Sequence, residues 1–122
     1  MKITRIYDDN GQSRFTDIDI SLNLIAPRRG VSGLRMSAPF AGGECLFRSF
    51  PQGSLDRHTA PQRQLVIILS GEGEIETGDG NTRRFRQGDV FLADDTTGEG
   101  HIARILTDVM TILVVPVTSI PA

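Results

Sequence analysis

Apolar and polar residues alternate along much of this chain, and the alternation predicts β-strands rather than helices. A weak strand that starts at Phe15 shows this best around Ile18–Leu22, where every second residue is apolar, as in a strand with one buried face. Gln64–Leu69 is apolar at every position after its first, so both faces of that strand should be covered. Further strands are expected over residues 3–6, 44–50, 72–77, 83–86, 90–93, 101–106 and 109–115.

Turn residues divide these strands at close intervals. Residues 78–81 read Gly-Asp-Gly-Asn, a hairpin signal, because Asp-Gly accepts the positive φ that tight hairpin turns require. Pro51 and Gly53 are expected to end the strand that precedes them. Residues 26–43 are irregular, and residues 94–100 form a polar loop. No helix longer than two turns is predicted, so the pattern favours an all-β sandwich or barrel.

Composition narrows the classes of function. The chain has 122 residues, a formal net charge of −2, no Trp and one Tyr. It therefore lacks the basic surface and the stacking aromatics of nucleic-acid-binding proteins. Cys45 is the single cysteine, which excludes an intrachain disulfide and a Cys-rich metal site. No apolar run reaches the roughly 18 residues of a membrane helix and no signal peptide is visible, so we expect a soluble, cytoplasmic protein with no nucleic-acid or membrane partner.

The first of two glycine-bounded stretches runs from Gly53 to Gly71. It contains His58, then Ala60 two residues later, then Gln64, which six residues separate from Gly71. This spacing resembles the first motif of the cupin superfamily, in which Gly, a His-X-His pair, Glu and Gly follow one another. His58 comes one residue early, Ala60 stands in place of the second His, and Gln64 stands in place of the Glu.

The second stretch begins with Gly-Asp-Val-Phe at residues 88–91 and ends beyond His101. It resembles the second cupin motif. Asp94 stands where Pro is usual, the loop before His101 is two residues longer, and Ile105 stands where Asn is usual. These departures affect the expected site more than the expected fold.

The resemblance implies an all-β, cupin-like double-stranded β-helix, also called a jelly-roll barrel, with one central pocket. Residues 1–122 would form this single domain, and residues 53–101 its motif core. Cupins include dioxygenases, isomerases, epimerases, lyases, sugar-binding modules and storage proteins, so the fold identifies no activity. The sequence leaves open whether the chain is an enzyme.

The resemblance also implies a set of metal ligands, namely His58, Gln64 and His101, for a divalent ion such as Fe, Mn, Ni or Zn. Because a neutral amide replaces the carboxylate, the site would lose Coulomb attraction and hold a metal weakly. Two alternatives remain open. The histidines are either polar pocket residues bonded to one another, to Gln64 or to water, or they work as an acid–base pair.

The expected ligand is a small oxygen-rich or anionic metabolite. It would be transformed at the metal or, in the alternative, only bound by a degenerate cupin that lacks metal. No nucleotide cofactor is expected, because the Gly-Glu-Gly-Glu run at residues 71–74 is followed by neither a helix nor a Lys-Ser/Thr pair. Besides the three ligands, the residues expected in the pocket are Arg48, Ala60, Val66, Phe91 and Asp95.

Some positions should pack outside the pocket. Leu65 and its neighbours on the outer face of the strongest strand need a cover, either the N-terminal strands or another subunit, and a homodimer is expected. Cys45 and Phe47 are expected to be buried. Cross-strand ion pairs are expected between the acidic run Glu72, Glu74, Glu76 and the basic run Arg83, Arg84, Arg86.

Overall fold

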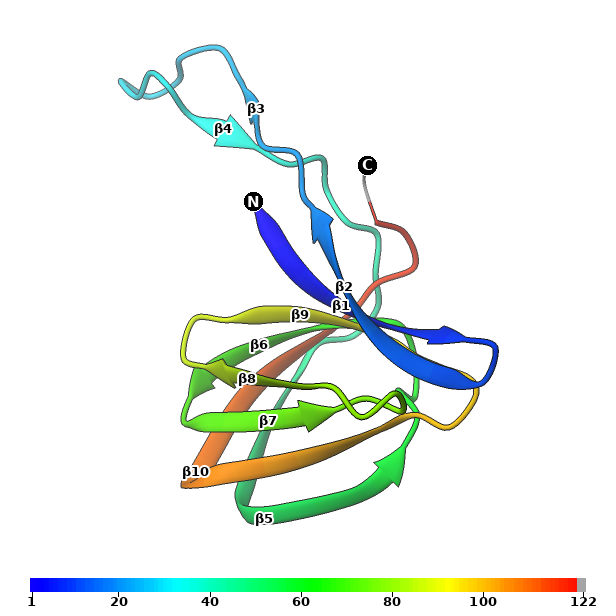
Figure 1. The fold of residues 1–122 in the computed structure, drawn as a ribbon. Helices are drawn as coiled ribbons and strands as arrows, with labels where there is room; N and C mark the ends of the chain where they lie inside the picture. The colour runs from blue at the N-terminus through cyan, green and yellow to red at the C-terminus, as the bar shows by residue number, and fades with distance from the viewer. Residues whose placement is uncertain (121–122) are drawn as a thin grey trace.

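A computed structural model describes residues 1–120, and every regular element in that range is a β-strand (Figure 1). No helix in the described range is long and apolar enough to cross a bilayer. The strands are β1 (Lys2–Asp9), β2 (Gln12–Asp19), β3 (Asn23–Leu24), β4 (Arg35–Met36), β5 (Leu46–His58), β6 (Gln64–Ser70), β7 (Glu72–Glu76), β8 (Thr82–Arg86), β9 (Val90–Asp94) and β10 (His101–Pro116).

One eight-stranded sheet forms the body of the molecule. Its order is β2-β1-β9-β6-β10-β7-β8, and β5 also pairs with β10. The sheet curls because β10 is long: its first half pairs with β7 and its second half with β6. All pairings are antiparallel except that of β1 with β9. The predicted all-β fold is thus confirmed, as one curled half-barrel sheet.

Several predicted strand boundaries are wrong. The strand predicted from Phe15 through Leu22 is β2, which begins at Gln12 and ends at Asp19. Residues 101–106 and 109–115 belong to the single strand β10, whose pairing with β5 shifts between Ile105 and Val109 but does not stop. β5 does not end at Pro51 or Gly53 and continues to His58. A proline is tolerated there because β5 pairs only with β10 within residues 1–120, and an edge strand does not need every backbone N–H in a ladder.

The predicted hairpin between β7 and β8 is confirmed. Gly80 has a φ of 85°, which L side chains rarely adopt. Asp79 holds the turn: its carboxylate accepts hydrogen bonds from the Thr77 hydroxyl at 2.6 Å and from the backbone and side-chain N–H groups of Asn81. These local contacts explain how a short polar segment reverses the chain.

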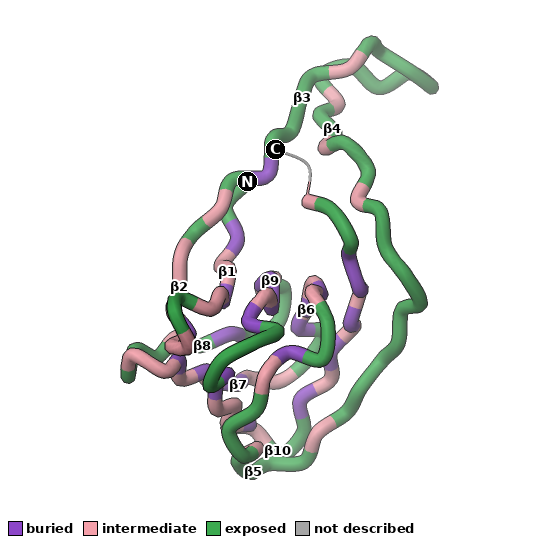
Figure 2. The backbone as a smooth tube through the Cα atoms, turned by 90° about the vertical axis from the view of Figure 1, so that its right-hand side faces the viewer, coloured by how far each residue is buried: buried purple, intermediate pink, exposed green. Residues whose placement is uncertain are grey.

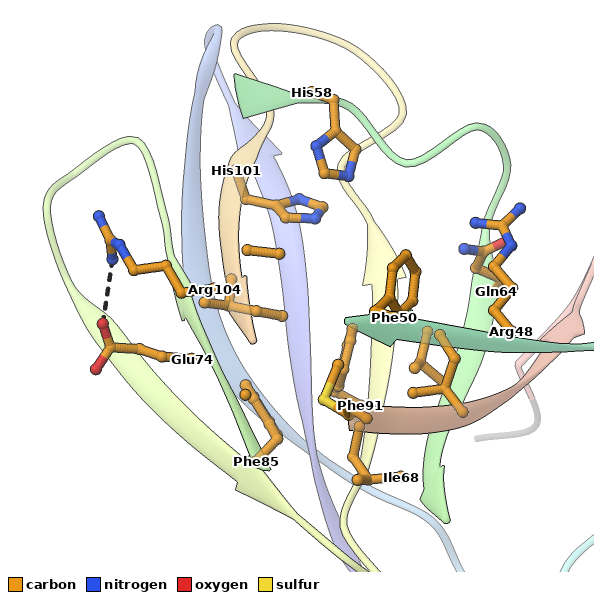
Figure 3. A pocket seen from close by; sticks show the side chains of 16 residues that line it. Arg48, Phe50, His58, Gln64, Ile68, Glu74, Phe85, Phe91, His101 and Arg104 are labelled. Carbon is orange, nitrogen blue, oxygen red and sulfur yellow. Dashed lines mark hydrogen bonds and ion pairs between the residues drawn. The ribbon is translucent and has the colours of Figure 1, made fainter. Parts of the chain in front are cut away.

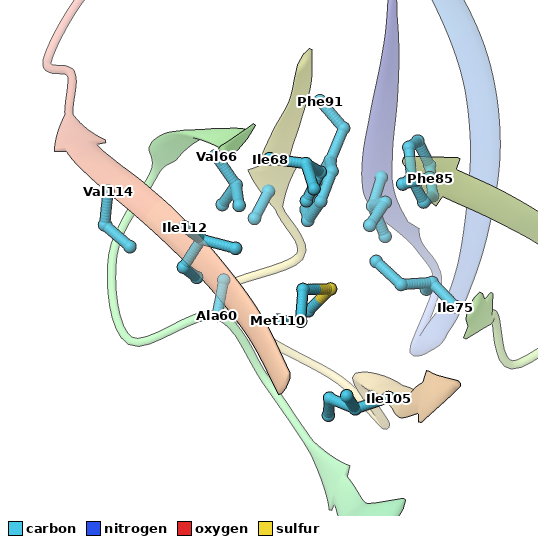
Figure 4. Close-up of a cluster of buried hydrophobic side chains, with 12 residues drawn as sticks. Ala60, Val66, Ile68, Ile75, Phe85, Phe91, Ile105, Met110, Ile112 and Val114 are labelled. Atoms are coloured by element: carbon cyan, nitrogen blue, oxygen red, sulfur yellow. The ribbon is translucent and has the colours of Figure 1, made fainter. Parts of the chain in front are cut away.

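The larger hydrophobic cluster fills the inside of the curl (Figure 4). Alternation along the strands produces it, because every second residue of a strand points to the same face. In β6 the inward residues Gln64, Val66 and Ile68 are buried, whereas Leu65 and Ile67 between them are only partly buried. The Phe85 and Phe91 rings stack at a tilt of 46°, with centroids 4.7 Å apart.

A second cluster covers the other face of the same strand. Ile3, Ile20, Leu92 and Val117 are its buried members, and Leu65 packs against them. The N-terminal strands of this chain therefore cover the outer face at Leu65, which is the first of the two covers predicted.

Three expectations outside the pocket need correction. Cys45 is exposed and the Phe47 side chain is 71% exposed, because Cys45 precedes the edge strand β5 and Phe47 lies at its start, away from the core. The predicted cross-strand ion pairs form only for Arg84, whose guanidinium lies 3.6 Å from Glu74. Arg83 instead reaches Asp17 at 2.7 Å, a contact between β8 and β2 that sequence spacing does not indicate.

Candidate functional site

A cavity of about 90 Å³ opens inside the curl of the sheet (Figure 3). Its walls are mostly apolar side chains of the larger hydrophobic cluster, including Ile68, Phe85 and Phe91. Its polar lining includes the side chains of Arg48, His58, Gln64 and His101, together with Glu74 and Arg104. An apolar cavity with a few polar groups is the usual form of a small-molecule site.

The fold brings the two histidines of the chain side by side. His58 ends β5, His101 begins β10, and the two residues are paired directly across the strands. Their imidazole centroids are 4.7 Å apart with an angle of 58° between the ring planes. Figure 3 shows both rings at the same end of the pocket.

The His58 ring has one nitrogen already bonded to the backbone. Its Nδ1 lies 2.7 Å from the carbonyl oxygen of Asp56. A carbonyl oxygen can only accept a hydrogen bond, so Nδ1 must carry the proton. In the neutral ring the lone pair is therefore on Nε2, where it is available to a ligand.

The His101 ring is fixed in a comparable way by a buried carboxylate. Its Nδ1 lies 2.5 Å from Oδ2 of Asp95, whose side chain is completely buried. An ionised carboxylate accepts from Nδ1–H, which again leaves the Nε2 lone pair free. Oδ1 of Asp95 has no hydrogen-bond partner in the described part of the chain. Asp95 therefore acts through His101 and holds its ring.

Gln64 lines the pocket but is placed differently from the histidines. Its side chain is buried, and within residues 1–120 its amide makes no hydrogen bond to the protein. In Figure 3 it lies apart from the two imidazoles. The amide is thus a polar group that faces the cavity without a protein partner.

The other predicted pocket residues divide into two groups. Arg48, Val66 and Phe91 line the cavity. Ala60 and Asp95 do not line it: Ala60 is buried in the hydrophobic cluster, and its N–H donates to the backbone carbonyl of Asp95 at 3.0 Å. Both residues lie behind the side chains that line the cavity.

Several lining residues were missed by the sequence reasoning. Phe50, Ile75 and Phe85 come from strands whose inward face was not assigned. The alternation of β7 could have identified its inward face, because the buried residues Gly73 and Ile75 flank the half-buried Glu74. Only the register between strands shows that these faces meet at one cavity.

An ion pair stands at the β7–β10 side of the pocket. Arg104 donates to Glu76 at 2.8 Å and to Glu74 at 3.1 Å. The hydrogen bond to Glu76 is the main cause that raises the pKa of the Arg104 guanidinium, which remains charged. Glu74 is therefore already paired with a cation and is a poor metal ligand.

The residues around the two histidines offer few further metal ligands. Among residues 1–120, no three His, Cys, Asp or Glu side chains lie close enough together to hold a metal ion. Two imidazoles bound to one ion at about 2.1 Å would have ring centroids roughly 5 Å apart, close to the separation seen here. The two histidines fit part of a coordination sphere, and water or a ligand would have to complete it.

Comparison with known proteins finds likeness only at the level of structure. No protein-family model matches the sequence, and no curated protein matches it. Among 23 matching solved chains is a protein from Neisseria meningitidis, with a TM-score of 0.50 and 9% identity, over 94% of this chain and 82% of that one.

Two further structures are described as cupins. An RmlC-like cupin from Shewanella frigidimarina matches with a TM-score of 0.46 and 17% identity, over 95% of this chain and 86% of that one. A cupin 2 conserved barrel domain protein from Leptotrichia buccalis matches with a TM-score of 0.47 and 24% identity, over 66% of this chain and 44% of that one. At these identities the likeness concerns the fold alone. The curled all-β sheet itself is the fold class that the sequence predicted.

Proposed function

We propose that this protein binds a small oxygen-rich or anionic metabolite in the barrel cavity, at a weakly held divalent metal between His58 and His101. The observation that carries the proposal is the paired imidazoles, each held at Nδ1 so that Nε2 is free. An imidazole fixed by a carboxylate or a carbonyl at one nitrogen is the usual arrangement of a metal-binding histidine.

The cavity supports a small ligand. A volume of about 90 Å³ is well below the 300 Å³ or more of a typical drug-sized pocket. The Arg48 guanidinium supplies a positive charge on the lining, and the Gln64 amide supplies both donors and an acceptor. A compact molecule of a few heavy atoms with carboxylate or hydroxyl oxygens matches this set.

The metal, when bound, would supply Lewis-acid polarisation of a ligand oxygen. Residues of the chain would orient the ligand and shape its surroundings. His58 and His101 orient the ligand, Asp95 keeps the His101 ring in place, and the apolar wall limits the access of water. Within residues 1–120 no carboxylate joins the two histidines as a third ligand, so the metal affinity should be low and depend on the bound metabolite.

Metal binding can be tested directly, because His58 and His101 are the only histidines of the chain. Purified protein is titrated with Mn²⁺, Ni²⁺ and Zn²⁺ by calorimetry, alone and with small carboxylates. We expect weak one-site binding that is lost in the His58→Ala, His101→Ala double variant. Cys45→Ser is the matched control, because it removes the single thiol and should leave binding unchanged. Equal metal binding by wild type and double variant would remove the proposal.

A second function is favoured by one observation, the absence of a third His, Cys, Asp or Glu ligand within residues 1–120. In that case the chain binds a small ligand without metal or catalysis. A thermal-shift screen of small anions in the presence of EDTA distinguishes the two. Stabilisation that persists in EDTA supports the metal-free function, and stabilisation that needs added metal supports the first.

A further inference from the structure

The polar side chains that line the cavity fall into three groups. The two histidines lie at the start of β10, and the Arg104 ion pair lies where β10 meets β7. Near the other end of β10, its neighbours on the two sides include Arg48 of β5 and Gln64 of β6. Figure 3 shows Arg48 and Gln64 on the side of the pocket away from the imidazoles. The cavity therefore has a second polar end besides the histidines.

Arg48 supplies the unbalanced charge of the lining. The charged lining residues are Arg48, Glu74 and Arg104. Arg104 already donates to Glu74 at 3.1 Å and to Glu76 at 2.8 Å, so its charge is balanced. Within residues 1–120 the Arg48 guanidinium forms no ion pair. An anion that enters the cavity is therefore attracted to the Arg48 end.

Arg48 is also placed to meet a ligand that comes from solvent. It lies in β5, whose residues are exposed at most positions (Figure 2). Its partner across the strands is Ile112 of β10, a buried residue that lines the same cavity. Directly paired residues of antiparallel strands point to the same face of the sheet, so Arg48 emerges on the cavity side.

Gln64 provides a buried polar group at the same end. The residue is 6% exposed and lines the cavity, and within residues 1–120 its amide makes no hydrogen bond to the protein. A buried amide without a hydrogen-bond partner is unfavourable, because it has lost water and gained nothing in exchange. A ligand with acceptor oxygens would satisfy the NH₂ group, which donates two hydrogen bonds.

We propose that Arg48 and Gln64 bind the carboxylate of the ligand, and that the ligand is a short hydroxy or oxo acid whose second oxygen faces the histidines. A guanidinium can bond both oxygens of a carboxylate at once, and the Gln64 amide adds a further donor. The inference rests on the proposed function, since it concerns the same cavity, and it names the class and the orientation of the ligand. Gln64 is then a ligand-binding residue and not the metal ligand that the cupin resemblance implied.

The wall between the two polar ends fits the carbon chain of such an acid. Phe50 of β5 and Met110 of β10 are paired across the strands, between the histidines and Arg48, and both line the cavity. A volume of about 90 Å³ corresponds to about three water molecules in the liquid. The chain must therefore be short, roughly two to four carbon atoms.

Titration of ¹⁵N-labelled protein tests the ligand class. The probes are glycolate, L-lactate, pyruvate and 3-hydroxybutyrate, each in EDTA and again with Zn²⁺, and each beside its neutral primary amide. We expect at least one acid to bind saturably, and its amide to bind at least about tenfold more weakly. The Gln64 side-chain NH₂ signals, identified by their loss in Gln64→Leu, should move with the acid and stay in place with the amide.

Variants test the two residues. Arg48→Gln should raise the Kd of the acid more than about tenfold and leave that of the neutral amide within about twofold. Gln64→Leu should raise the Kd of the acid at least about fivefold. Arg86→Gln is the matched control, because it removes the same charge from an exposed arginine of β8 that does not line the cavity, and it should leave the Kd unchanged. If Gln64→Leu does not fold, the NH₂ signals of the wild type still decide the role of Gln64.

The outcomes separate this inference from the proposed function. Acid binding that ignores Arg48→Gln and Gln64→Leu but is lost in the His58→Ala, His101→Ala double variant overturns the inference and leaves the proposed function standing. Acid binding in EDTA that depends on Arg48 and Gln64 supports the inference, even where calorimetry finds no metal at the histidines. Failure of all four acids to bind at up to about 100 mM overturns the inference, whether or not the histidines hold a metal.

Discussion

Asp95 and Asp56 show how single contacts decide what a histidine can do. The Asp56 carbonyl and the Asp95 carboxylate each take the Nδ1 hydrogen of one imidazole. The two rings are thereby given the same tautomer and present the same nitrogen to a ligand. The sequence shows two histidines at cupin-like positions, but it does not show that each has a partner behind it.

This arrangement predicts the tautomers. Long-range ¹H–¹⁵N spectra of the neutral imidazoles should show both His58 and His101 protonated at Nδ1. Asp95→Asn should disturb His101, because the amide replaces a charged acceptor, and should leave His58 unchanged. A wild-type His58 ring protonated at Nε2 would contradict the hydrogen bond to the Asp56 carbonyl.

Asp79 carries a pH-dependent contribution to stability. The hydrogen bond from Thr77, followed by those from Asn81 and the charge of Arg14, holds the pKa of Asp79 below its ordinary value of 3.8, while partial burial opposes the shift. A carboxyl whose folded pKa is lowered stabilises the fold above the unfolded pKa, and this stabilisation is lost as the pH falls through the folded value.

Asp79→Ala should therefore lower the free energy of unfolding by about 1 kcal/mol at neutral pH. The difference from wild type should persist down to roughly pH 4 and shrink below it. Urea unfolding at a series of pH values measures it. A difference that grows as the pH falls from 4 to 2 would have the wrong sign for this cause.

Among the turns that join strands, those at Gly71 and Gly88 require glycine for different physical reasons. Gly71 joins β6 to β7 with a φ of 81°, and a Cβ there would stand 2.3 Å from the Val109 carbonyl oxygen. Gly88 joins β8 to β9 with a φ of 91°, but a Cβ there would meet nothing within 4 Å. The turn at Gly71 is constrained by its positive φ and by the close backbone of β10. The turn at Gly88 is constrained by its positive φ alone.

Gly71→Ala and Gly88→Ala separate these effects. Gly88→Ala should lower the free energy of unfolding by about 1 kcal/mol, the usual difference for a left-handed conformation. Gly71→Ala should lower it by about 3 kcal/mol or more, because the backbone of β10 must also move. Denaturant unfolding of both variants measures the difference, and equal losses would show that the contact with β10 is unimportant.

At the scale of the whole molecule, one carboxylate ties together three segments that are distant in sequence. Asp94 at the end of β9 accepts from Arg5 of β1 at 2.7 Å and from Arg63, just before β6, at 2.8 Å. The Asp94 side chain is only 7% exposed, whereas the Arg5 and Arg63 side chains are 34% and 39% exposed. Asp94 thus ties β9 to the start of β1 and to the segment that leads into β6.

Asp94→Asn should lower the free energy of unfolding by about 1–2 kcal/mol, since the partly exposed arginines can be rehydrated. Asp108→Asn is the control, because Asp108 is exposed and forms no ion pair within residues 1–120. Thermal unfolding at low and high salt measures both variants. A loss that is equal for the two would show that the Asp94 pairs contribute nothing specific.

The position of most strands and the all-β fold class follow from the sequence alone. Alternation, glycine turns and the Asp-Gly hairpin are local properties, set by side-chain direction and φ within a few residues. For that reason the predicted bounds of β6, β7, β8 and β9 lie close to the observed ones.

Contacts between distant segments, in contrast, become visible only in the folded chain. The length of β5 depends on its pairing with β10, the burial of Asp95 depends on the loop that carries it behind His101, and the exposure of residues 21–39 depends on the body offering them no surface. These are effects of register and packing between parts of the chain far apart in sequence. No pattern within a short window can encode them, because the partner residue lies outside the window.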